Sequence, residues 1–244
     1  MVNYEIITCD DFLKIFKDVN KVLVLGKGKL SNKLPKKGYD LFVGVKQSIG
    51  ALKRKDILVM NDFEGFFGIE KYLKDIKYIL MPNKPHLRQM PEFIAKEYAL
   101  KYLKKNNFAG KIMFYELGSN KERDSSLFFL KKNINSGDII LSFLELAKKK
   151  IKVDIFGIYK TVEENTNISK LILNAKPEIY QDIYQDYLRR VYSNKEKMND
   201  KMFHAANCSF FKKNIDTEKK TKNRFERLQI LIKKNYNELI INFY

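Results

Sequence analysis

Lys21-Val22-Leu23-Val24-Leu25-Gly26 is the stretch that decides the fold, a short apolar run that ends at a glycine. Similar apolar runs follow at 41–45, 57–60 and 78–81. Short uninterrupted apolar runs are typical of strands buried on both faces, whereas a strand with one face in water alternates apolar and polar residues. The sequence therefore predicts a parallel sheet that is covered on both sides.

Helical stretches and further strands alternate with these runs along the chain. We expect helices at 67–75, 92–104, 138–149 and 224–236. We expect further strands at 111–115, 153–158 and 239–243, the first of them at an edge of the sheet. This alternation favours an α/β fold, with a Rossmann-like, mostly parallel sheet and helices on both faces. Ligands of such sheets bind beyond the carboxyl ends of the strands, so the residues that follow each strand are the first candidates for a site.

One segment, 160–222, differs in composition from the rest of the chain. It is polar, rich in lysine and asparagine, and carries tyrosines at 180, 184, 187 and 192. We therefore expect an α/β domain at 1–159, a lid or insertion at 160–222, and a final helix and strand at 223–244 that return to the first domain.

The composition excludes several classes of protein. The chain has 244 residues, and its hydrophobic fraction of 45% is enough for a core, which excludes a wholly disordered chain. No stretch approaches the roughly eighteen uninterrupted apolar residues of a transmembrane helix, and the first residues lack the pattern of a signal peptide. Two cysteines, Cys9 and Cys208, cannot form a disulfide framework. A reducing compartment, the cytoplasm, fits best.

The formal net charge is +18, from 47 Lys+Arg against 29 Asp+Glu. Nucleic acid, an anionic membrane and a phosphorylated small molecule all attract such a protein. Only seven of the basic residues are arginines and 40 are lysines, whereas proteins that read bases usually employ arginine. An RNA-binding hypothesis thus rests on charge alone, and we expect no nucleic acid as partner.

Small and polar residues follow the first strands and one later loop. Gly26-Lys27-Gly28-Lys29-Leu30-Ser31 follows the first strand, where glycines let backbone amides approach a phosphate, although the same residues also make an ordinary tight turn. Lys46-Gln47-Ser48 and Asn61-Asp62 follow the next two, where polar side chains either contact a base or sugar edge or are plain loop residues. Asn133-Ile134-Asn135-Ser136-Gly137-Asp138 precedes a helix that Asn135 or Ser136 would cap.

The two histidines, His86 and His204, have no Cys or His at metal-binding spacing, so we expect no metal site. Apolar residues flank His204, which favours a buried structural histidine. The wider segment is polar, however, and lies before the last helix and strand, where a lid would meet the sheet. Histidine is the natural general base near neutral pH, so a catalytic role stays open beside the structural one.

The order of these motifs resembles that in the bacterial sialyltransferases of glycosyltransferase family 42. The family's G-N-G-P-S loop is similar to 26–31, its C-N-Q turn to 45–47, and the asparagine after its third strand to Asn61. Its histidine–leucine pair is similar to His86-Leu87, its R-I-T-S-G loop to 133–137, and its G-I-D turn to Gly157-Ile158-Tyr159. A lid with tyrosines and then a histidine follow in both, so the resemblance extends over nearly the whole chain from residue 21.

The resemblance implies that 1–159 binds a nucleotide and that the chain is an inverting, metal-independent glycosyltransferase. It implies transfer from a CMP-linked sugar to a hydroxyl of a glycan or glycolipid, as in bacterial lipooligosaccharide or capsule synthesis, with no cofactor beyond the donor. His204 would be the general base. The implied donor-binding residues are Gly26, Lys27, Gly28, Ser31, Lys46, Gln47, Asn61, Asp62, Asn135, Ser136 and Gly137, with Tyr159, Tyr180 and Tyr184 as candidates for contact with the phosphate.

The sequence departs from the family pattern at three positions, and these keep other partners open. Lys27 and Lys46 stand where the family has asparagines, and Asn133 where it has an arginine. Lysine suits a phosphate better than a base edge, so another CMP-linked acid sugar or a diphosphate nucleotide is an alternative donor. The remaining lysines would allow peripheral contact with the anionic inner face of a membrane. A homo-oligomer is a further expectation.

A second hypothesis is a nucleotide-binding protein of the same fold that transfers no sugar. The pterin pyrophosphokinases have a similar G-x-G-x-S start, and flagellin-modification proteins contain related glycosyltransferase-like domains.

Overall fold

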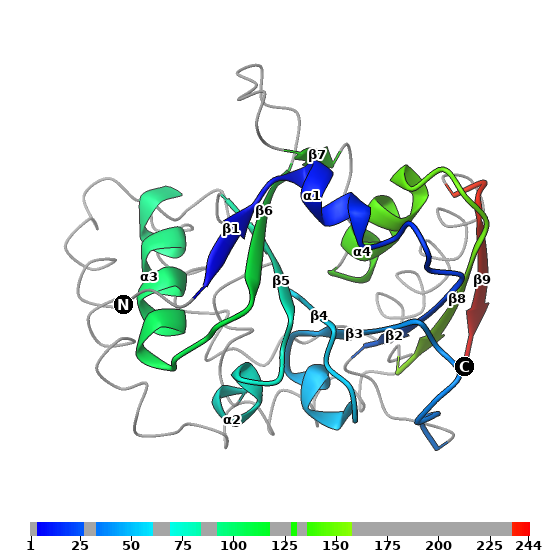
Figure 1. Cartoon of the computed structure of the whole chain (residues 1–244), viewed down its shortest axis with the longest axis horizontal. Helices are drawn as coiled ribbons and strands as arrows, with labels where there is room; N and C mark the ends of the chain where they lie inside the picture. Colours follow the sequence, from blue (N-terminus) through cyan, green and yellow to red (C-terminus); the bar gives the residue numbers. More distant parts are fainter. Residues whose placement is uncertain are drawn as a thin grey trace, which may run out of the picture.

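The computed structural model describes residues 4–26, 33–60, 69–83, 92–117, 128–130, 136–157 and 236–244. Its strands form one sheet, in which all the described pairs of neighbours run parallel (Figure 1). The strands are β1 (Glu5–Ile7), β2 (Lys21–Leu25), β3 (Leu41–Val45), β4 (Ile57–Val59), β5 (Tyr78–Pro82), β6 (Lys111–Leu117), β7 (Phe128–Leu130), β8 (Ile151–Phe156) and β9 (Leu239–Phe243). Their order in the sheet is β1-β6-β5-β4-β3-β2-β8-β9, and β7 pairs with β6. The chain therefore has the α/β fold with a Rossmann-like parallel sheet that the sequence predicts.

The expected strand at 111–115 is not at an edge. It is β6, which lies between β5 on one side and both β1 and β7 on the other. Glu5 of β1 pairs with Lys111, and their side chains form an ion pair of 2.9 Å. The expectation was wrong because β1 is only three residues long and two of its three residues are exposed, so the sequence shows no strand pattern there.

Other strand bounds differ little from those expected. β2, β3 and β9 have the expected bounds, β4 ends one residue early at Val59, and β5 extends to Pro82. The strand expected at 153–158 is β8, which begins at Ile151 and ends at Phe156. Gly157 has a positive φ of 66° and ends the strand.

The described helices are α1 (Cys9–Lys14), α2 (Glu70–Leu73), α3 (Glu92–Lys105), α4 (Ser136–Leu146) and the 3-10 helix η1 (Lys46–Ala51). α3 fits the expected helix, whereas α2 is shorter than expected and ends at Leu73. α4 begins two residues earlier and ends three earlier than expected, and Lys148 after it has a φ of 49°, so the lysine run lies beyond the helix. The helix expected at 224–236 lies, except for its last residue, outside the described residues.

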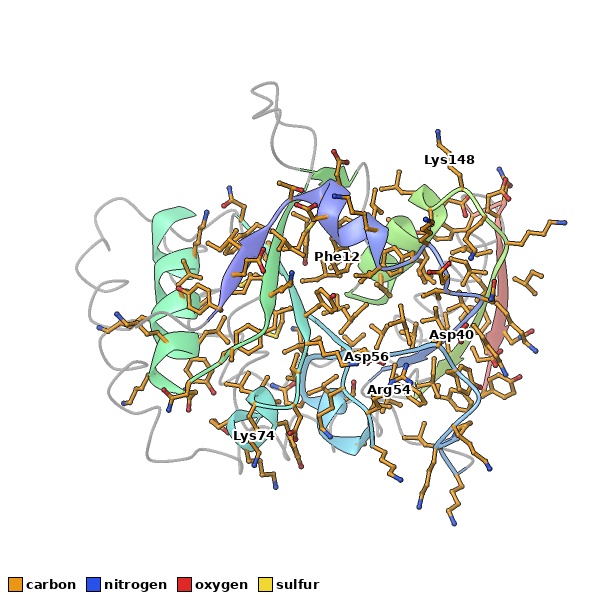
Figure 2. The ribbon with its side chains drawn as sticks, in the orientation of Figure 1. Phe12, Asp40, Arg54, Asp56, Lys74 and Lys148 are labelled. Atoms are coloured by element: carbon orange, nitrogen blue, oxygen red, sulfur yellow. The ribbon has the colours of Figure 1, made fainter. Side chains whose placement is uncertain are left out.

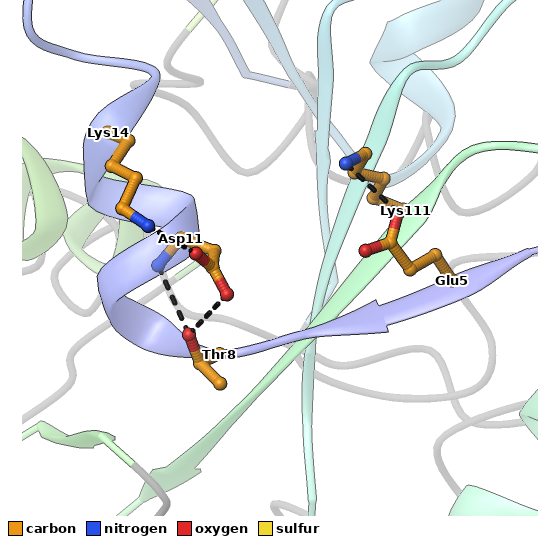
Figure 3. A network of polar contacts seen from close by, with 5 residues as sticks. All are labelled: Glu5, Thr8, Asp11, Lys14 and Lys111. Carbon is orange, nitrogen blue, oxygen red and sulfur yellow. Dashed lines mark hydrogen bonds and ion pairs between the residues drawn. The ribbon is translucent and has the colours of Figure 1, made fainter.

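α1 is a helix that the sequence pattern did not indicate. Thr8 caps it, because the Thr8 hydroxyl accepts a hydrogen bond from the Asp11 amide at 3.1 Å (Figure 3). The Asp11 carboxylate accepts hydrogen bonds from Thr8 at 2.8 Å and from Lys14 at 2.6 Å. The cap thus begins the helix directly after β1 and turns Phe12 toward the core.

Alternate residues of the central strands pack into two apolar layers. Leu23 and Leu25 of β2 belong to the layer that η1, α2 and α3 cover. Val22 and Val24 belong to the other layer, which α1 and α4 cover. Phe12 of α1 is fully buried there, and its ring lies 5.4 Å from that of Phe143 of α4. Burial on both faces explains why these strands are continuously apolar.

The C-terminal strand joins the sheet beside β8, where Asp154 pairs with Asn242. The lid expected at 160–222 lies outside the described residues. Within the described part of the chain, no helix is both long and apolar enough to span a bilayer.

Candidate functional site

The order of strands reverses between β2 and β8. From β2, the strands β3, β4, β5 and β6 follow one another outward in chain order, whereas β8 and then β9 lie on the other side of β2. In open parallel sheets such a reversal leaves a crevice beyond the carboxyl ends of the two strands, because the connections leave in opposite directions. The candidate site therefore lies where β2 and β8 end.

Two glycines meet at this point. The Gly26 amide donates a hydrogen bond of 2.8 Å to the carbonyl of Phe156. A Cβ at Gly26 would lie 2.6 Å from the carbonyl oxygen of Gly157. Gly157 itself adopts a φ of 66°, which favours glycine. The ends of β2 and β8 thus approach more closely than side chains would allow, and backbone groups line this part of the edge.

A Gly26→Ala substitution is expected to lower the free energy of unfolding by about 1–3 kcal/mol, because the new methyl group would overlap a backbone carbonyl that has no rotamer to change. Urea denaturation followed by circular dichroism measures this difference. A variant as stable as the native protein would show that the ends of β2 and β8 separate freely, which contradicts the close approach described here.

The end of β3 carries two of the candidate residues on a sharp turn. Lys46 has a φ of 52° and begins η1, and the amide oxygen Oε1 of Gln47 is buried. η1 folds back over Gly44, where a Cβ would lie 2.5 Å from Cα of Ile49. Gly44 pairs with Leu25, so this turn lies beside the end of β2.

Ser48 joins the turn to β2, a structural role that differs from the base or sugar contact considered for the polar residues of this loop. Its hydroxyl accepts a hydrogen bond of 2.8 Å from the Val45 amide and lies 2.6 Å from the carbonyl oxygen of Leu25, to which it donates. The structure therefore brings Gly26, Lys46 and Gln47 to one edge of the sheet. A serine two residues after the turn was the only sequence signal for this link.

Asn83 and Lys96 are a second pair at the carboxyl edge that sequence reasoning did not single out. The Asn83 amide donates to the carbonyl of Tyr115 at 2.8 Å, which continues the ladder between β5 and β6. Lys96 of α3 donates to Oδ1 of Asn83 at 3.0 Å. Only the position of Asn83 directly after a strand could have indicated it.

Several ion pairs lie at the opposite edge, where the strands begin. Asp56 precedes β4, accepts a hydrogen bond of 3.0 Å from the Phe42 amide, and lies 2.6 Å from Nε of Arg54 and 3.0 Å from Nζ of Lys77. Figure 2 shows Asp40, Arg54 and Asp56 near one another beside β3. The Asp40 carboxylate accepts hydrogen bonds from the backbone amides of Asn20 and Lys21, and these bonds hold the pKa of the carboxyl below its ordinary value. These groups are positioned to hold the amino-terminal ends of the strands in place.

Asp154 is a buried carboxylate on β8. It accepts hydrogen bonds from Asn242 at 2.7 Å and from Tyr39 at 2.8 Å, and it lies 3.4 Å from Nζ of Lys21. Burial acts to raise the pKa of Asp154, but these two hydrogen bonds and the charge of Lys21 outweigh it, so the pKa lies below the ordinary value. Burial, and then the bond to Asp154, raise the pKa of Tyr39, which keeps its hydroxyl a donor. Asp154 therefore links β2, β9 and the segment before β3.

The first turn of α4 lies on the side where the strands end. Near its last turn, the Glu145 carboxylate accepts hydrogen bonds of 2.9 Å and 3.2 Å from the amides of Asn237 and Glu238, which precede β9. The helix thus runs opposite to the strands. Ser136 is its first residue, and Asn135, the other candidate for the cap, lies outside the described residues, so the expected cap stays a prediction. Gly137 follows Ser136 within the same turn.

The remaining candidates stay predictions, because they lie outside the described residues. They are Lys27, Gly28, Ser31, Asn61, Asp62, Tyr159, Tyr180, Tyr184 and His204. Within the described ranges, no three His, Cys, Asp or Glu side chains gather in a way that could hold a metal ion.

Burial, and then the charge of Asp10, raise the pKa of Cys9 to about 11, so this thiol stays protonated at neutral pH.

Comparison of the chain with protein-family models, curated proteins and solved structures gives no match. The resemblance to the sialyltransferases therefore rests on the order of short motifs alone.

Proposed function

We propose that the chain is an inverting, metal-independent glycosyltransferase that binds a nucleotide sugar at the carboxyl ends of β2, β8 and the neighbouring β3. The observation that carries the proposal is the close approach of Gly26 and Gly157 where the strand order reverses. At such a point, backbone amides and the crevice between two connections suit a nucleotide phosphate.

The neighbouring residues support a phosphate at this edge. Lys46 follows β3 directly, and β3 is the strand beside β2. An ammonium is a point charge that suits a phosphate oxygen better than a flat base edge. Ser48 and Gly44 hold the turn that presents Lys46, so its backbone is fixed before a ligand binds.

In the proposed reaction, the sugar passes from the nucleotide to a hydroxyl of a glycan or glycolipid with inversion at the anomeric carbon. His204 takes the proton of that hydroxyl as its oxygen attacks. Lysine side chains and a lid tyrosine hydroxyl meet the charge that develops on the leaving phosphate, so the reaction needs no metal. The CMP-linked donor is what the resemblance to the sialyltransferases implies, and the lysines at 27 and 46 extend the proposal to other donors that carry a phosphate.

Thermal denaturation with CMP, UDP, GDP and their sugar conjugates tests the proposal. A ligand at a hundred times its Kd stabilises the native state by about 2.7 kcal/mol, which corresponds to a rise in Tm of roughly 5–10 °C for a chain of this size. We expect this rise with CMP and its conjugates and a smaller rise for Lys46→Gln. No shift with any nucleotide would contradict the proposal, and a shift with UDP or GDP alone would move it to another donor.

The same panel separates the second hypothesis. Nucleotide binding without sugar transfer or donor hydrolysis, across a range of acceptors, would favour a nucleotide-binding protein of another activity. Binding of RNA that falls steeply with salt would favour a nucleic-acid partner instead.

A further inference from the structure

Lys96 lies over the carboxyl edge of the sheet, away from the ends of β2 and β8. Its ammonium donates a hydrogen bond of 3.0 Å to Oδ1 of Asn83 and lies 4.4 Å from the centroid of the Phe114 ring. Asn83 follows β5 and Phe114 belongs to β6, so two neighbouring strands and α3 fix one cation. A half-buried lysine held from two sides in this way has given up much of its conformational freedom.

The partners of this cation are neutral. In the described part of the chain, no carboxylate pairs with Lys96, whereas Lys77 and Lys111 lie 3.0 Å and 2.9 Å from an acidic oxygen. An ammonium has three donors, and one of them is engaged by Asn83. The ring face attracts the charge without neutralising it. The structure thus holds a positive charge in place with donors that suit an oxyanion.

The position of Lys96 relates it to the proposed nucleotide site. β5 lies two strands from β3 in the sheet, and neighbouring strands lie about 4.8 Å apart. The backbone positions of Asn83 and Lys46, which follow these strands, are therefore roughly 10 Å apart along one edge. A sugar joined to a nucleotide is long enough to cover such a distance. One end of a substrate near Gly26 would therefore bring another part of it, or a second substrate, near Lys96.

We propose that Lys96 binds a second oxyanion, a carboxylate or phosphate that is separate from the phosphate held near Gly26 and Lys46. This inference rests on the proposed function and names a substrate class, an acidic donor sugar or an acidic acceptor. Asn83 and Phe114 position the ammonium, and Lys96 makes the contact.

The test compares Lys96→Met with the native protein by calorimetric titration and by initial rates. Methionine keeps an unbranched stem that packs well on Phe114, so it removes the charge with little change in shape. Lys104→Met is the matched control, because Lys104 lies on the exposed side of the same helix. The probes are CMP alone, a CMP-linked acid sugar, and paired acceptors with and without a carboxylate.

We expect Lys96→Met to bind CMP within twofold of the native protein. If the donor supplies the oxyanion, affinity for the CMP-linked acid sugar falls about tenfold or more, the loss of one charge-assisted hydrogen bond. If the acceptor supplies it, KM rises about tenfold for the acidic acceptor only. Lys96→Arg, which keeps the charge, should restore most of either loss, and Lys104→Met should show neither.

Failure of the inference and failure of the proposed function give different results. Native protein that binds and uses these probes, with Lys96→Met indistinguishable from it, overturns the role of Lys96 and leaves the glycosyltransferase proposal intact. Equal losses for CMP and for neutral acceptors would assign Lys96 a structural role, which also overturns the inference. Native protein that binds none of the nucleotides or their sugar conjugates, whether of CMP, UDP or GDP, overturns the proposed function, and the inference with it.

Discussion

Replacing Asp154 with alanine is expected to lower the free energy of unfolding by about 2–4 kcal/mol. The carboxylate is 1% exposed, and its removal leaves the Tyr39 hydroxyl and the Asn242 amide without their acceptor in a part-buried place. Each such loss is worth about 1–3 kcal/mol. Lys21 remains partly in water and adds little. Urea denaturation measures the change, and Asp11→Ala, which removes an exposed ion pair, is the control with a much smaller effect.

The pH dependence checks the cause of this loss. Since the pKa of Asp154 is below its ordinary value of 3.8 in the folded chain, the ionised carboxylate stabilises the fold above that pH, and this contribution disappears as the pH falls through the folded pKa. The difference in the free energy of unfolding between the native protein and Asp154→Asn should therefore be constant near neutral pH and become smaller below about pH 4. A difference that does not change with pH would assign the effect to shape rather than to charge.

Replacing His204 with alanine is expected to slow sugar transfer by roughly 10²- to 10⁴-fold, the contribution of a general base to such a step. Donor affinity should stay unchanged, because the histidine acts on the acceptor hydroxyl in the proposed mechanism. Initial rates at saturating donor, with nucleotide titration as the control, measure the two separately. Normal transfer by His204→Ala would remove this residue from the mechanism, and lost donor binding would indicate a structural role.

Most of the sheet could be predicted from the sequence, because a strand that is buried on both faces is apolar at nearly every residue. The runs in β2 and β3 are apolar at nearly every residue, and the strand bounds followed from them. β1 has no such apolar run, since it is short and partly exposed. Its place beside β6 also depends on residues far along the chain. The early start of α4 was missed because glycine and serine in a first turn look like a loop.

The candidate site divides in the same way. Gly26, Lys46 and Gln47 were indicated because each follows a strand, and in a parallel sheet strand ends share one edge. Ser48 and Lys96 depend on contacts across that edge, with Leu25 and with Asn83, that no local pattern encodes. The role of Asp154 could not be predicted from the sequence either, because it depends on hydrogen bonds from Asn242 on β9 and from Tyr39 before β3.

The pairing of β2 with β8 has a kinetic consequence. Lys21 lies beside Lys152, so the centre of the sheet is completed only when two distant parts of the chain meet. Contacts of such long sequence separation slow folding, because the entropy of closing the loop is lost before the contact stabilises anything. The glycine contact between these strands cannot exist in a partly folded chain that lacks β8. Recovery of ligand binding after dilution from denaturant should therefore follow the slowest folding phase rather than precede it.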